Sequence, residues 1–156
     1  MCGIAGFYNI NGGYSSESPH WISILNDMNR TQFHRGPDGN GTYLCDCCGL
    51  AHVRLAIIDL VNGSQPLVKS HGGLKYAISY NGEIYNMKEL RSALKAEGAT
   101  FDTASDTEVI LEGYMRHGSD FIKCLNGIFA AAILDENHNR LILFRDRLGV
   151  KPLFYT

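Results

Sequence analysis

The strongest constraint on the fold lies near the C-terminal end of the sequence, where two apolar segments flank a short polar turn. Gly127–Asp135 and Arg140–Arg145 are apolar along most of their length, and Glu136-Asn137-His138-Asn139 separates them. This pattern predicts a β-hairpin. A strand with one face in water alternates apolar and polar residues, whereas a strand covered on both faces does not. The hairpin is therefore expected inside a layered fold, with other elements packed on both faces of its sheet.

The rest of the chain shows a series of extended and helical patterns. Strands are expected at residues 2–10, Thr42–Cys45, Leu50–Asp59 and Lys75–Tyr80. One helix is expected from Ser18 as N-cap, with Pro19 at the first helical position, to about Phe33. Two more are expected from the capping pattern of Asn86 and Glu89 to Gly98, and from Ser105-Asp106-Thr107-Glu108 to about Gly118. The order of strands, helix, strands, two helices and strands predicts an α+β fold in which helices cover stacked sheets.

Composition excludes several classes of protein. The chain has 156 residues, 45% of them hydrophobic, and this is the composition of one globular domain. Its net charge is −2 without a basic block, so no nucleic-acid partner and no polybasic membrane surface are expected. No stretch reaches the ~18 apolar residues of a membrane span, and the apolar first residues lack a preceding positive region. We therefore expect a cytoplasmic protein.

The five cysteines do not suggest a disulfide framework, because their number is odd and no secretion signal precedes them. Cys45, Cys47 and Cys48 lie close to His52 in the sequence, which raises the possibility of a zinc site. Their spacing does not fit a C-x-x-C knuckle, and no second pair follows. We expect no metal here, and instead a reduced hairpin turn around Asp46.

Cys2 stands in an unusual place for a thiol. It follows an initiator methionine of the kind that is removed when the next residue is small, so processing would leave Cys2 as the first residue. A free thiol has a pKa of roughly 8.5 and an α-amine one of roughly 7.7–8.0, so the amine can accept the thiol proton near neutral pH. Cys2 is therefore a candidate nucleophile that carries its own base. The alternative is a buried structural cysteine.

Six short motifs extend this hypothesis to a family. Together they resemble the N-terminal glutaminase domain of glutamine-hydrolysing asparagine synthetases, and the resemblance covers essentially the whole chain. Two sibling classes, the glucosamine-6-phosphate synthases and the phosphoribosylpyrophosphate amidotransferases, also begin Cys-Gly-Ile. The Pro-Asp-Gly of the second motif and the fourth motif favour the asparagine synthetase branch. The motifs are Met1-Cys2-Gly3-Ile4-Ala5-Gly6, His34-Arg35-Gly36-Pro37-Asp38-Gly39, Arg54-Leu55-Ala56-Ile57-Ile58-Asp59, Asn81-Gly82-Glu83-Ile84-Tyr85-Asn86, Ser105-Asp106-Thr107-Glu108 and Arg145-Asp146-Arg147-Leu148-Gly149-Val150-Lys151-Pro152-Leu153.

The resemblance implies an N-terminal-nucleophile hydrolase fold, a four-layer αββα sandwich, with Cys2 as nucleophile. It assigns the oxyanion site, which binds the negative oxygen of the tetrahedral intermediate, to the Asn81 side chain and the Gly82 backbone N–H. Two N–H donors suit this task. The alternative for Asn-Gly is a type I′ hairpin turn. Such a turn should be followed by a strand, whereas Asn86 opens a helix.

The amino-acid end of glutamine needs a cation for its carboxylate and an anion for its ammonium. Arg54 can hold a carboxylate through two parallel hydrogen bonds. The alternative is a structural arginine paired with Asp59. Glu83 and Asp106 are expected to hold the ammonium, and Asp106 also suits the N-terminus of its helix. By family analogy, backbone groups of Leu55, Ala56, Ile57 and Ile58 also line the glutamine site.

Other polar residues are weaker candidates. His34–Gly39 resembles a loop that closes over glutamine, but an ordinary connection is an equal alternative. His34 and His52 are less suited as general bases, because the α-amine already supplies that function. The segment from Arg145 to Pro152 is interpreted as structural. Ala104 departs from the family pattern, in which glycine or a small polar residue is common.

The resemblance also defines the expected context. Residues 1–156 are expected to be a type-2 glutamine amidotransferase domain, incomplete at its C-terminus, with the synthetase domain absent. The expected activity is hydrolysis of the glutamine side-chain amide through a Cys2 thioester. The ammonia would go to an ATP-dependent asparagine synthetase domain of the same or a partner chain. No cofactor is expected here, since ATP and Mg²⁺ belong to the synthetase domain. Sheet edges exposed by missing strands would also permit a homodimer. The alternatives are a sibling amino-sugar or purine amidotransferase and a truncated, non-catalytic module.

Overall fold

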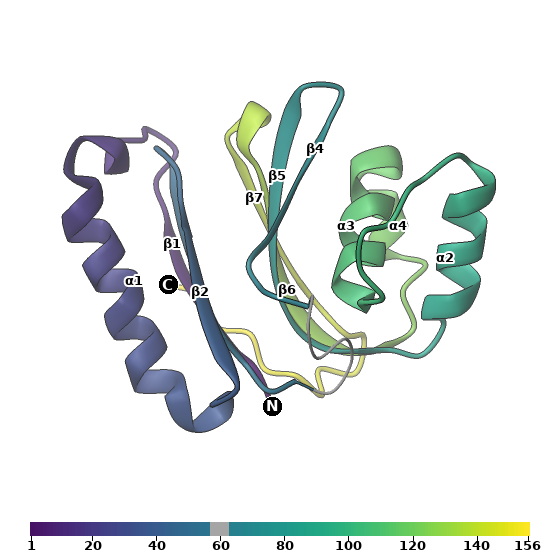
Figure 1. Cartoon of the computed structure of the whole chain (residues 1–156), viewed down its shortest axis with the longest axis horizontal. Helices are drawn as coiled ribbons and strands as arrows, with labels where there is room; N and C mark the ends of the chain where they lie inside the picture. The colour runs from purple at the N-terminus through teal and green to yellow at the C-terminus, as the bar shows by residue number, and fades with distance from the viewer. Residues whose placement is uncertain (57–62) are drawn as a thin grey trace.

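The computed structural model describes residues 1–56 and 63–156 of the chain, and its elements form four layers (Figure 1). Helix α1 (Ser18–Gln32) covers the outer face of a first sheet. A second sheet packs against the inner face of the first. Helices α2 (Met87–Ala96), α3 (Asp106–His117) and α4 (Ser119–Ile122) cover the outer face of the second sheet. The predicted αββα sandwich is therefore confirmed.

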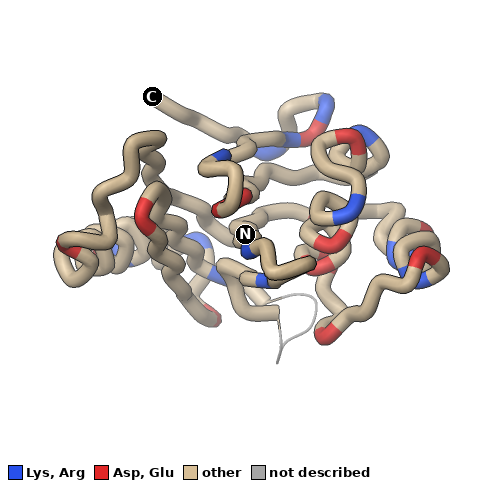
Figure 2. Tube along the Cα trace, turned by 90° about the horizontal axis from the view of Figure 1, so that it is seen from above, with Lys and Arg blue, Asp and Glu red and all other residues tan. Residues whose placement is uncertain are grey.

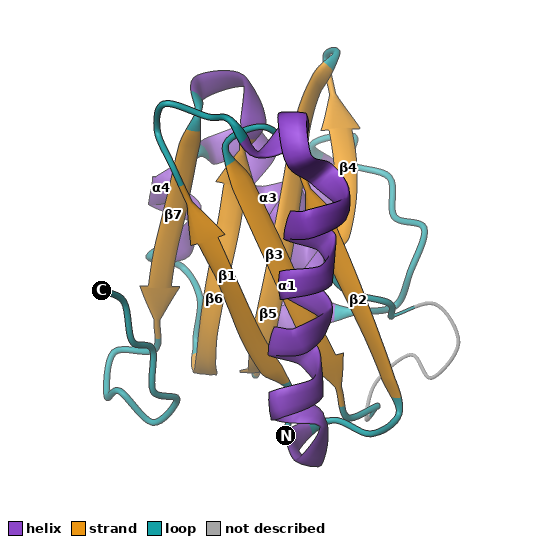
Figure 3. Cartoon of the chain, turned by 90° about the vertical axis from the view of Figure 1, so that its left-hand side faces the viewer, coloured by secondary structure: helices purple, strands orange, loops and turns teal. Residues whose placement is uncertain are grey.

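Both sheets are antiparallel. The first has the order β1 (Gly3–Tyr8), β3 (Cys48–Arg54), β2 (Gly39–Leu44), and α1 crosses its outer face (Figure 3). The second has the order β4 (Leu67–His71), β5 (Leu74–Ile84), β6 (Gly127–Asp135), β7 (Arg140–Arg145). Short 3₁₀ helices η1 (Tyr14–Glu17), η2 (Phe33–Arg35) and η3 (Glu136–His138) join some of these elements.

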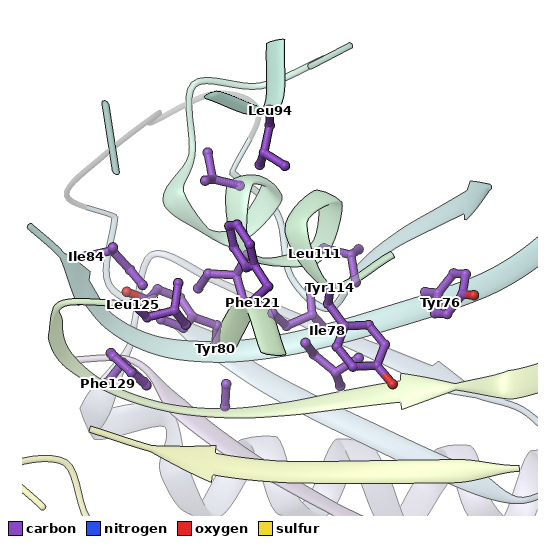
Figure 4. Packing of buried hydrophobic residues seen from close by; sticks show 14 of the residues in the cluster. Tyr76, Ile78, Tyr80, Ile84, Leu94, Leu111, Tyr114, Phe121, Leu125 and Phe129 are labelled. Atoms are coloured by element: carbon purple, nitrogen blue, oxygen red, sulfur yellow. The ribbon is translucent and has the colours of Figure 1, made fainter. Parts of the chain in front are cut away.

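Two apolar cores hold the layers together. The larger lies between the second sheet and its helices, where β5 and β6 face α3 and α4 (Figure 4). Ile78, Leu111 and Ile133 are fully buried there. The smaller core lies between the sheets and includes Leu50 and Leu134. Its cysteine and alanine members are Cys47, Cys48, Ala77 and Ala132, and their small size suits two closely stacked sheets.

Several predicted elements are confirmed. The hairpin of β6 and β7 has the predicted bounds. Helix α3 begins after Ser105, whose side chain accepts a hydrogen bond from the Glu108 N–H at 3.3 Å. Cys45 and Cys48 close the predicted turn between β2 and β3 through a 2.9 Å backbone hydrogen bond.

Other predictions need correction. β7 is an edge strand with partly exposed residues, so burial on both faces holds for β6 alone. β3 ends at Arg54, since Leu55 and Ala56 are irregular, and the rest of the predicted strand, residues 57–59, lies outside the described residues. β5 runs to Ile84, four residues beyond its predicted end. Strand β4 was not predicted from its mixed sequence.

Two predicted helix caps lack the expected side-chain hydrogen bond. Ser18 is the first residue of α1, and its hydroxyl donates to the Ser15 carbonyl instead of capping the helix. Asn86 is the N-cap residue of α2, as predicted, but its side chain makes no capping hydrogen bond. Its side chain donates to the Cys124 carbonyl at 2.9 Å and accepts from the Asn126 N–H at 3.0 Å. Asn86 thus joins the start of α2 to the start of β6, a tertiary contact that outweighs the local capping pattern.

None of the helices in the described parts of the chain is both long and apolar enough to cross a bilayer.

Replacement of Leu111 by alanine tests the larger core. Leu111 is fully buried, whereas Leu148 is 90% exposed and makes a matched control. Leu111→Ala should lower the free energy of unfolding by about 2–5 kcal/mol, because it removes buried methyl groups and leaves a cavity. Leu148→Ala should change it by less than about 0.5 kcal/mol. Urea unfolding followed by circular dichroism measures both values, and equal losses would contradict this description of the core.

Candidate active site

A cavity of about 140 Å³ lies at one end of the sandwich, where the N-terminus enters β1. Figure 2 shows the N-terminus near the middle of the molecule, with cationic and anionic residues drawn around it. This cavity is lined by residues from the start of the chain, the end of β3, the segment before β4, the second half of β5, the start of α3, the start of β6 and the turn after β7. They are Met1, Cys2, Arg54, Leu55, Gly63, Gln65, Tyr80, Asn81, Gly82, Glu83, Ser105, Asp106, Thr107, Ile128 and Lys151.

Seven of the predicted site residues are therefore brought together: Cys2, Arg54, Leu55, Asn81, Gly82, Glu83 and Asp106. Ala56 is not among the residues that line the cavity, and its N–H donates to the Asp38 carboxylate at 2.9 Å. Ile57 and Ile58, which were also predicted, lie outside the described residues, as does Asp59.

The pairing of β1 with β3 positions Cys2. Gly3 pairs with Val53, so Cys2 lies beside the end of β3. The Leu55 N–H donates to Cys2 Sγ at 3.3 Å. A Cβ on Gly3 would lie 2.5 Å from Gln32 Oε1, so glycine allows α1 to pack close to the start of this strand. The thiol is half-buried and stands at the cavity wall.

Asn81 and Gly82 lie inside β5, where they pair with Ala130 and Phe129 of β6. The type I′ turn considered for Asn-Gly is therefore wrong, because the chain continues straight to Ile84. A Cβ on Gly82 would come within 2.2 Å of the Ile128 carbonyl oxygen, so any side chain at this position would collide with backbone.

The strand alternation also determines where the Gly82 N–H points. Phe129 directs both its N–H and its carbonyl toward Asp146, on the β7 side of β6. Its partner Gly82 therefore belongs to a non-hydrogen-bonded pair and points away from β6. β4 pairs with β5 only as far as Ile78. The Gly82 N–H is thus directed to the edge of β5 on the β4 side, at a point where β4 no longer pairs with β5.

Tyr80 shares that edge, since it precedes Gly82 by two residues. The Gln65 side chain takes the place of a neighbouring strand there: its Oε1 accepts from the Tyr80 N–H at 2.7 Å and its Nε2 donates to the Tyr80 carbonyl at 3.1 Å. Beyond Gln65 the edge of β5 meets the cavity, which both Gln65 and Gly82 line. This observation supports a backbone donor at Gly82.

Asp106 is a buried acid at the first residue of α3. The Tyr80 hydroxyl donates to its Oδ2 at 2.8 Å, and the Thr107 N–H donates to its Oδ1 at 2.9 Å. Burial raises the pKa of Asp106, and these hydrogen bonds oppose the rise. Burial and the neighbouring Asp106 raise the pKa of Tyr80, so this hydroxyl stays a donor. A ligand ammonium would relieve the burial cost of the carboxylate.

The loop 34–39 contacts the backbone of Arg54. The Asp38 N–H donates to the Arg54 carbonyl at 3.0 Å, and Pro37 forms a bridge to Arg54. A Cβ on Gly36 would lie 2.5 Å from Arg54 backbone atoms. None of the residues 34–39 is among those that line the cavity. These contacts favour a supporting connection over the lid considered for this loop.

Neither histidine considered as a base lines the cavity. His52 is fully buried between the sheets, with Nδ1 3.0 Å from the Ser79 hydroxyl. Burial, with a smaller contribution from Arg54, lowers the pKa of His52 to about 3. The ring is therefore neutral at physiological pH and belongs to the core.

The cysteines of the β2–β3 turn lie elsewhere. Cys45 and Cys47 place their sulfur atoms 3.6 Å apart, and burial raises the pKa of Cys45 to about 12. Within the described ranges, 1–56 and 63–156, no three His, Cys, Asp or Glu side chains are arranged to hold a metal ion.

Eight residues that line the cavity were not predicted as site residues: Met1, Gly63, Gln65, Tyr80, Ser105, Thr107, Ile128 and Lys151. Gln65 and Lys151 are two of them. Lys151 was interpreted as structural, and Gln65 received no interpretation. Asp146 brings Lys151 to the cavity, because its carboxylate accepts hydrogen bonds from the N–H groups of Val150 and Lys151 and folds the turn after β7. No periodic pattern marks either residue. Only the position of Lys151 in the last motif pointed to it.

Comparison with known proteins places this geometry in context. A family model described as a glutamine amidotransferase domain matches residues 1–156. Asparagine synthetase [glutamine-hydrolyzing] 3 of Bacillus subtilis (strain 168) is 42% identical over 156 residues, which cover 100% of this chain and 25% of the relative. Asparagine synthetase [glutamine-hydrolyzing] of Sandersonia aurantiaca is 42% identical over 154 residues, covering 99% and 28%. The chain thus spans about a quarter of the length of these curated relatives.

Among solved structures, the glutamine phosphoribosylpyrophosphate amidotransferase from B. subtilis, complexed with ADP and GMP, is similar with a TM-score of 0.57 and 27% identity. The match covers 70% of this chain and 25% of that one.

Gly82→Ala should destabilise the protein by about 1–3 kcal/mol, because the added methyl group collides with the backbone of β6. Gly39 is a matched control, since a Cβ there would lie 4.0 Å from its nearest neighbour, a side-chain atom of Arg54. Gly39→Ala should leave the midpoint of thermal unfolding nearly unchanged. A Gly82→Ala protein as stable as the Gly39→Ala protein would show that the register of β5 and β6 differs from the one described.

Proposed function

Because this chain belongs to the glutamine amidotransferase domain family, we propose that its cavity binds glutamine and hydrolyses the side-chain amide through Cys2. The observation that carries this proposal is the convergence of Cys2, Asn81, Gly82, Arg54 and Asp106 on one cavity. These residues come from both sheets and from α3. Each supplies a group that the reaction needs.

The cavity can bind the amino-acid end of glutamine through opposite charges. Arg54 would hold the carboxylate with two hydrogen bonds. Asp106 and Glu83 would hold the ammonium, and Tyr80 and Thr107 already orient the Asp106 carboxylate. We also propose that the backbone of Leu55, Ala56, Ile57 and Ile58 contributes, as the family analogy implies. For Leu55, the hydrogen bond to Cys2 and its place in the cavity wall support this.

The chemistry then follows from the position of the thiol. Removal of Met1 frees the α-amine of Cys2, which accepts the thiol proton as Sγ attacks the amide carbon. The negative oxygen of the tetrahedral intermediate is bound by the Asn81 side chain and the Gly82 N–H. The C–N bond breaks, the amine returns its proton to the leaving ammonia, and a thioester remains. Water then attacks the thioester and releases glutamate and the Cys2 thiol.

We further propose that the ammonia serves an asparagine synthetase domain, in the same or a partner chain. The matches to asparagine synthetases over essentially the whole chain favour this acceptor over an amino sugar or a purine precursor. The hydrolysis needs no cofactor, because every group in it belongs to this chain or to the substrates. ATP and Mg²⁺ would be needed only by the synthetase domain.

The remaining expectations concern context. We propose that residues 1–156 are the glutaminase domain of this assembly, and that it acts in the cytoplasm, where reducing conditions keep the Cys2 thiol free. The homodimer stays a prediction, which the molar mass in solution tests.

Cys2→Ala should lower the rate of glutamine hydrolysis at least about 10³-fold while the fold is retained, because it deletes the nucleophile and little volume. Cys124→Ala changes an exposed cysteine outside the cavity and is the matched control. A form that retains Met1 should be about as inactive as Cys2→Ala, since it lacks the free amine. Glutamate release measures all four proteins. Turnover by Cys2→Ala above roughly a tenth of the wild-type rate would remove Cys2 from the mechanism.

Asn81→Ala and Arg54→Lys should differ in their kinetic effects. Asn81→Ala removes a donor whose bond strengthens as charge develops on the oxygen, so kcat should fall by ~10²–10³. Arg54→Lys keeps the charge but loses the paired hydrogen bonds, so KM for glutamine should rise most. Steady-state kinetics separate the two effects. An Asn81→Ala protein with an unchanged kcat and a raised KM would contradict the assignment of Asn81 to the oxyanion site.

A further inference from the structure

Lys151 is a buried cation beside the N-terminus with no function assigned above. The residue is 8% exposed. Its backbone N–H donates to Asp146 Oδ2 at 2.9 Å, which fixes the residue at the end of the turn after β7. Its ammonium donates to Met1 Sδ at 2.6 Å. Met1, Cys2 and Lys151 line the same cavity.

The ammonium has no carboxylate partner in the described part of the chain, residues 1–56 and 63–156. Among the ion pairs of the described residues, those that contain lysine involve Lys69, Lys75 and Lys123, and none involves Lys151. A buried cation is costly unless it is paired or has a function. Asp146, the carboxylate next to it in the turn, accepts from backbone N–H groups. The ammonium extends past that turn to the N-terminal residue.

The contact with Met1 indicates what Lys151 will face after processing. Met1 is joined to the nitrogen of Cys2, so removal of Met1 turns that nitrogen into an α-amine. The space that Met1 occupied then separates this amine from the Lys151 ammonium. The α-amine nitrogen of Cys2 and the Lys151 Nζ are therefore separated by about the length of one methionine residue. Both lie at the wall of the cavity.

We propose that Lys151 is a positioning residue for the reaction, whose ammonium keeps the α-amine of processed Cys2 in its uncharged, proton-accepting form. This inference rests on the proposed function. A nearby like charge disfavours the protonated amine. The amine can accept the thiol proton only when it is uncharged. Lys151 thus extends the pH range of the reaction toward lower pH and does not itself contact the reacting atoms.

Other charged and titratable groups lie near the same amine. Cations among them disfavour its protonated form, and anions favour it. Arg35 donates through Nε to the Cys2 carbonyl at 3.2 Å, so its charge is directed to the oxygen side of the residue. Asp106 would favour the charged amine, but its oxygens already accept from Tyr80 and Thr107. The groups of this kind that line the cavity are the Cys2 thiol, Arg54, the Tyr80 hydroxyl, Glu83, Asp106 and Lys151. The charged end of Lys151 contacts Met1.

Lys151→Met removes the charge and keeps most of the length of the side chain. The measurement is kcat/KM for glutamine hydrolysis between pH 5 and 9, on the chain without Met1. The midpoint of the acidic limb should move upward by roughly 0.5–1 pH unit, the size expected for one charge several ångströms away in partly screened surroundings. Lys151→Arg should restore the wild-type midpoint. Lys151→Gln is measured in parallel, so that misfolding of one variant does not decide the result.

The matched control is Lys123→Met, since Lys123 forms an exposed ion pair with Asp120 outside the cavity. It should leave the midpoint unchanged. If Lys151→Met raises KM for glutamine without moving the midpoint, Lys151 binds the substrate carboxylate and the inference is wrong. A midpoint that Lys151→Arg fails to restore would also overturn it, because the effect would then depend on packing and not on charge.

A second measurement separates this inference from the proposed function. In the Cys2→Ala background, the rate at which acetic anhydride acylates the α-amine, followed by peptide mass mapping, reports the uncharged fraction of that amine without any turnover. Adding Lys151→Met should move the midpoint of this rate upward by the same amount. No shift would overturn the inference even if the wild type hydrolyses glutamine. Absence of hydrolysis by a folded, processed wild type would instead overturn the proposed function.

Discussion

The pairing of β1 with β3 is the constraint on which the rest of the site depends. It holds the N-terminal residue of the chain, which is normally the most mobile part of a protein, against the end of a buried strand. The register that pairs Gly3 with Val53 brings Cys2 Sγ to the Leu55 N–H and to the wall that contains Arg54. A slip of one residue would turn the thiol to the opposite face of the sheet. The strand register thus holds the thiol that we propose as the nucleophile in a fixed position at the cavity wall.

The second sheet supplies the other half of the site, because β4 pairs with only part of the length of β5. β4 leaves the edge of β5 after Ile78, Gln65 satisfies Tyr80, and the next N–H on that edge belongs to Gly82. Helix α3 begins beside this edge and presents Asp106. The two sheets therefore bring complementary groups to one cavity: the first sheet supplies the Cys2 thiol and Arg54, and the second supplies Asn81 and Gly82, the proposed oxyanion donors. The substrate would lie between them.

Local patterns in the sequence predicted the elements that form through contacts between residues close in the sequence. The hairpin Gly127–Arg145 has strongly apolar strands and a polar turn, and the Ser105 cap acts within one helical turn, so both were found with their bounds. β4 and the end of β5 depend on a neighbouring strand that no local pattern shows. The side-chain partners of Asn86 were missed because they lie 38 and 40 residues away in the sequence.

The candidate site was predicted mainly from motifs. Seven of the predicted residues line the cavity, and their side chains or backbone groups can bind the charged ends or the amide of glutamine. Lys151 was missed because its role depends on the turn that Asp146 folds, and on a contact with Met1 from the other end of the chain. Gln65 was missed because its side chain forms the hydrogen bonds to the Tyr80 backbone that a neighbouring strand would otherwise form. Neither feature can be derived from the spacing of residues.

The central claim is that a processed N-terminal Cys2 is the nucleophile in a glutamine site. The most direct test is the intact mass of the protein after treatment with an electrophilic glutamine analogue, followed by peptide mapping. We predict one adduct on the species that lacks Met1, located on Cys2 and slowed by excess glutamine. The same adduct forming equally fast on the species that retains Met1, or forming on Cys124 instead, would contradict the account.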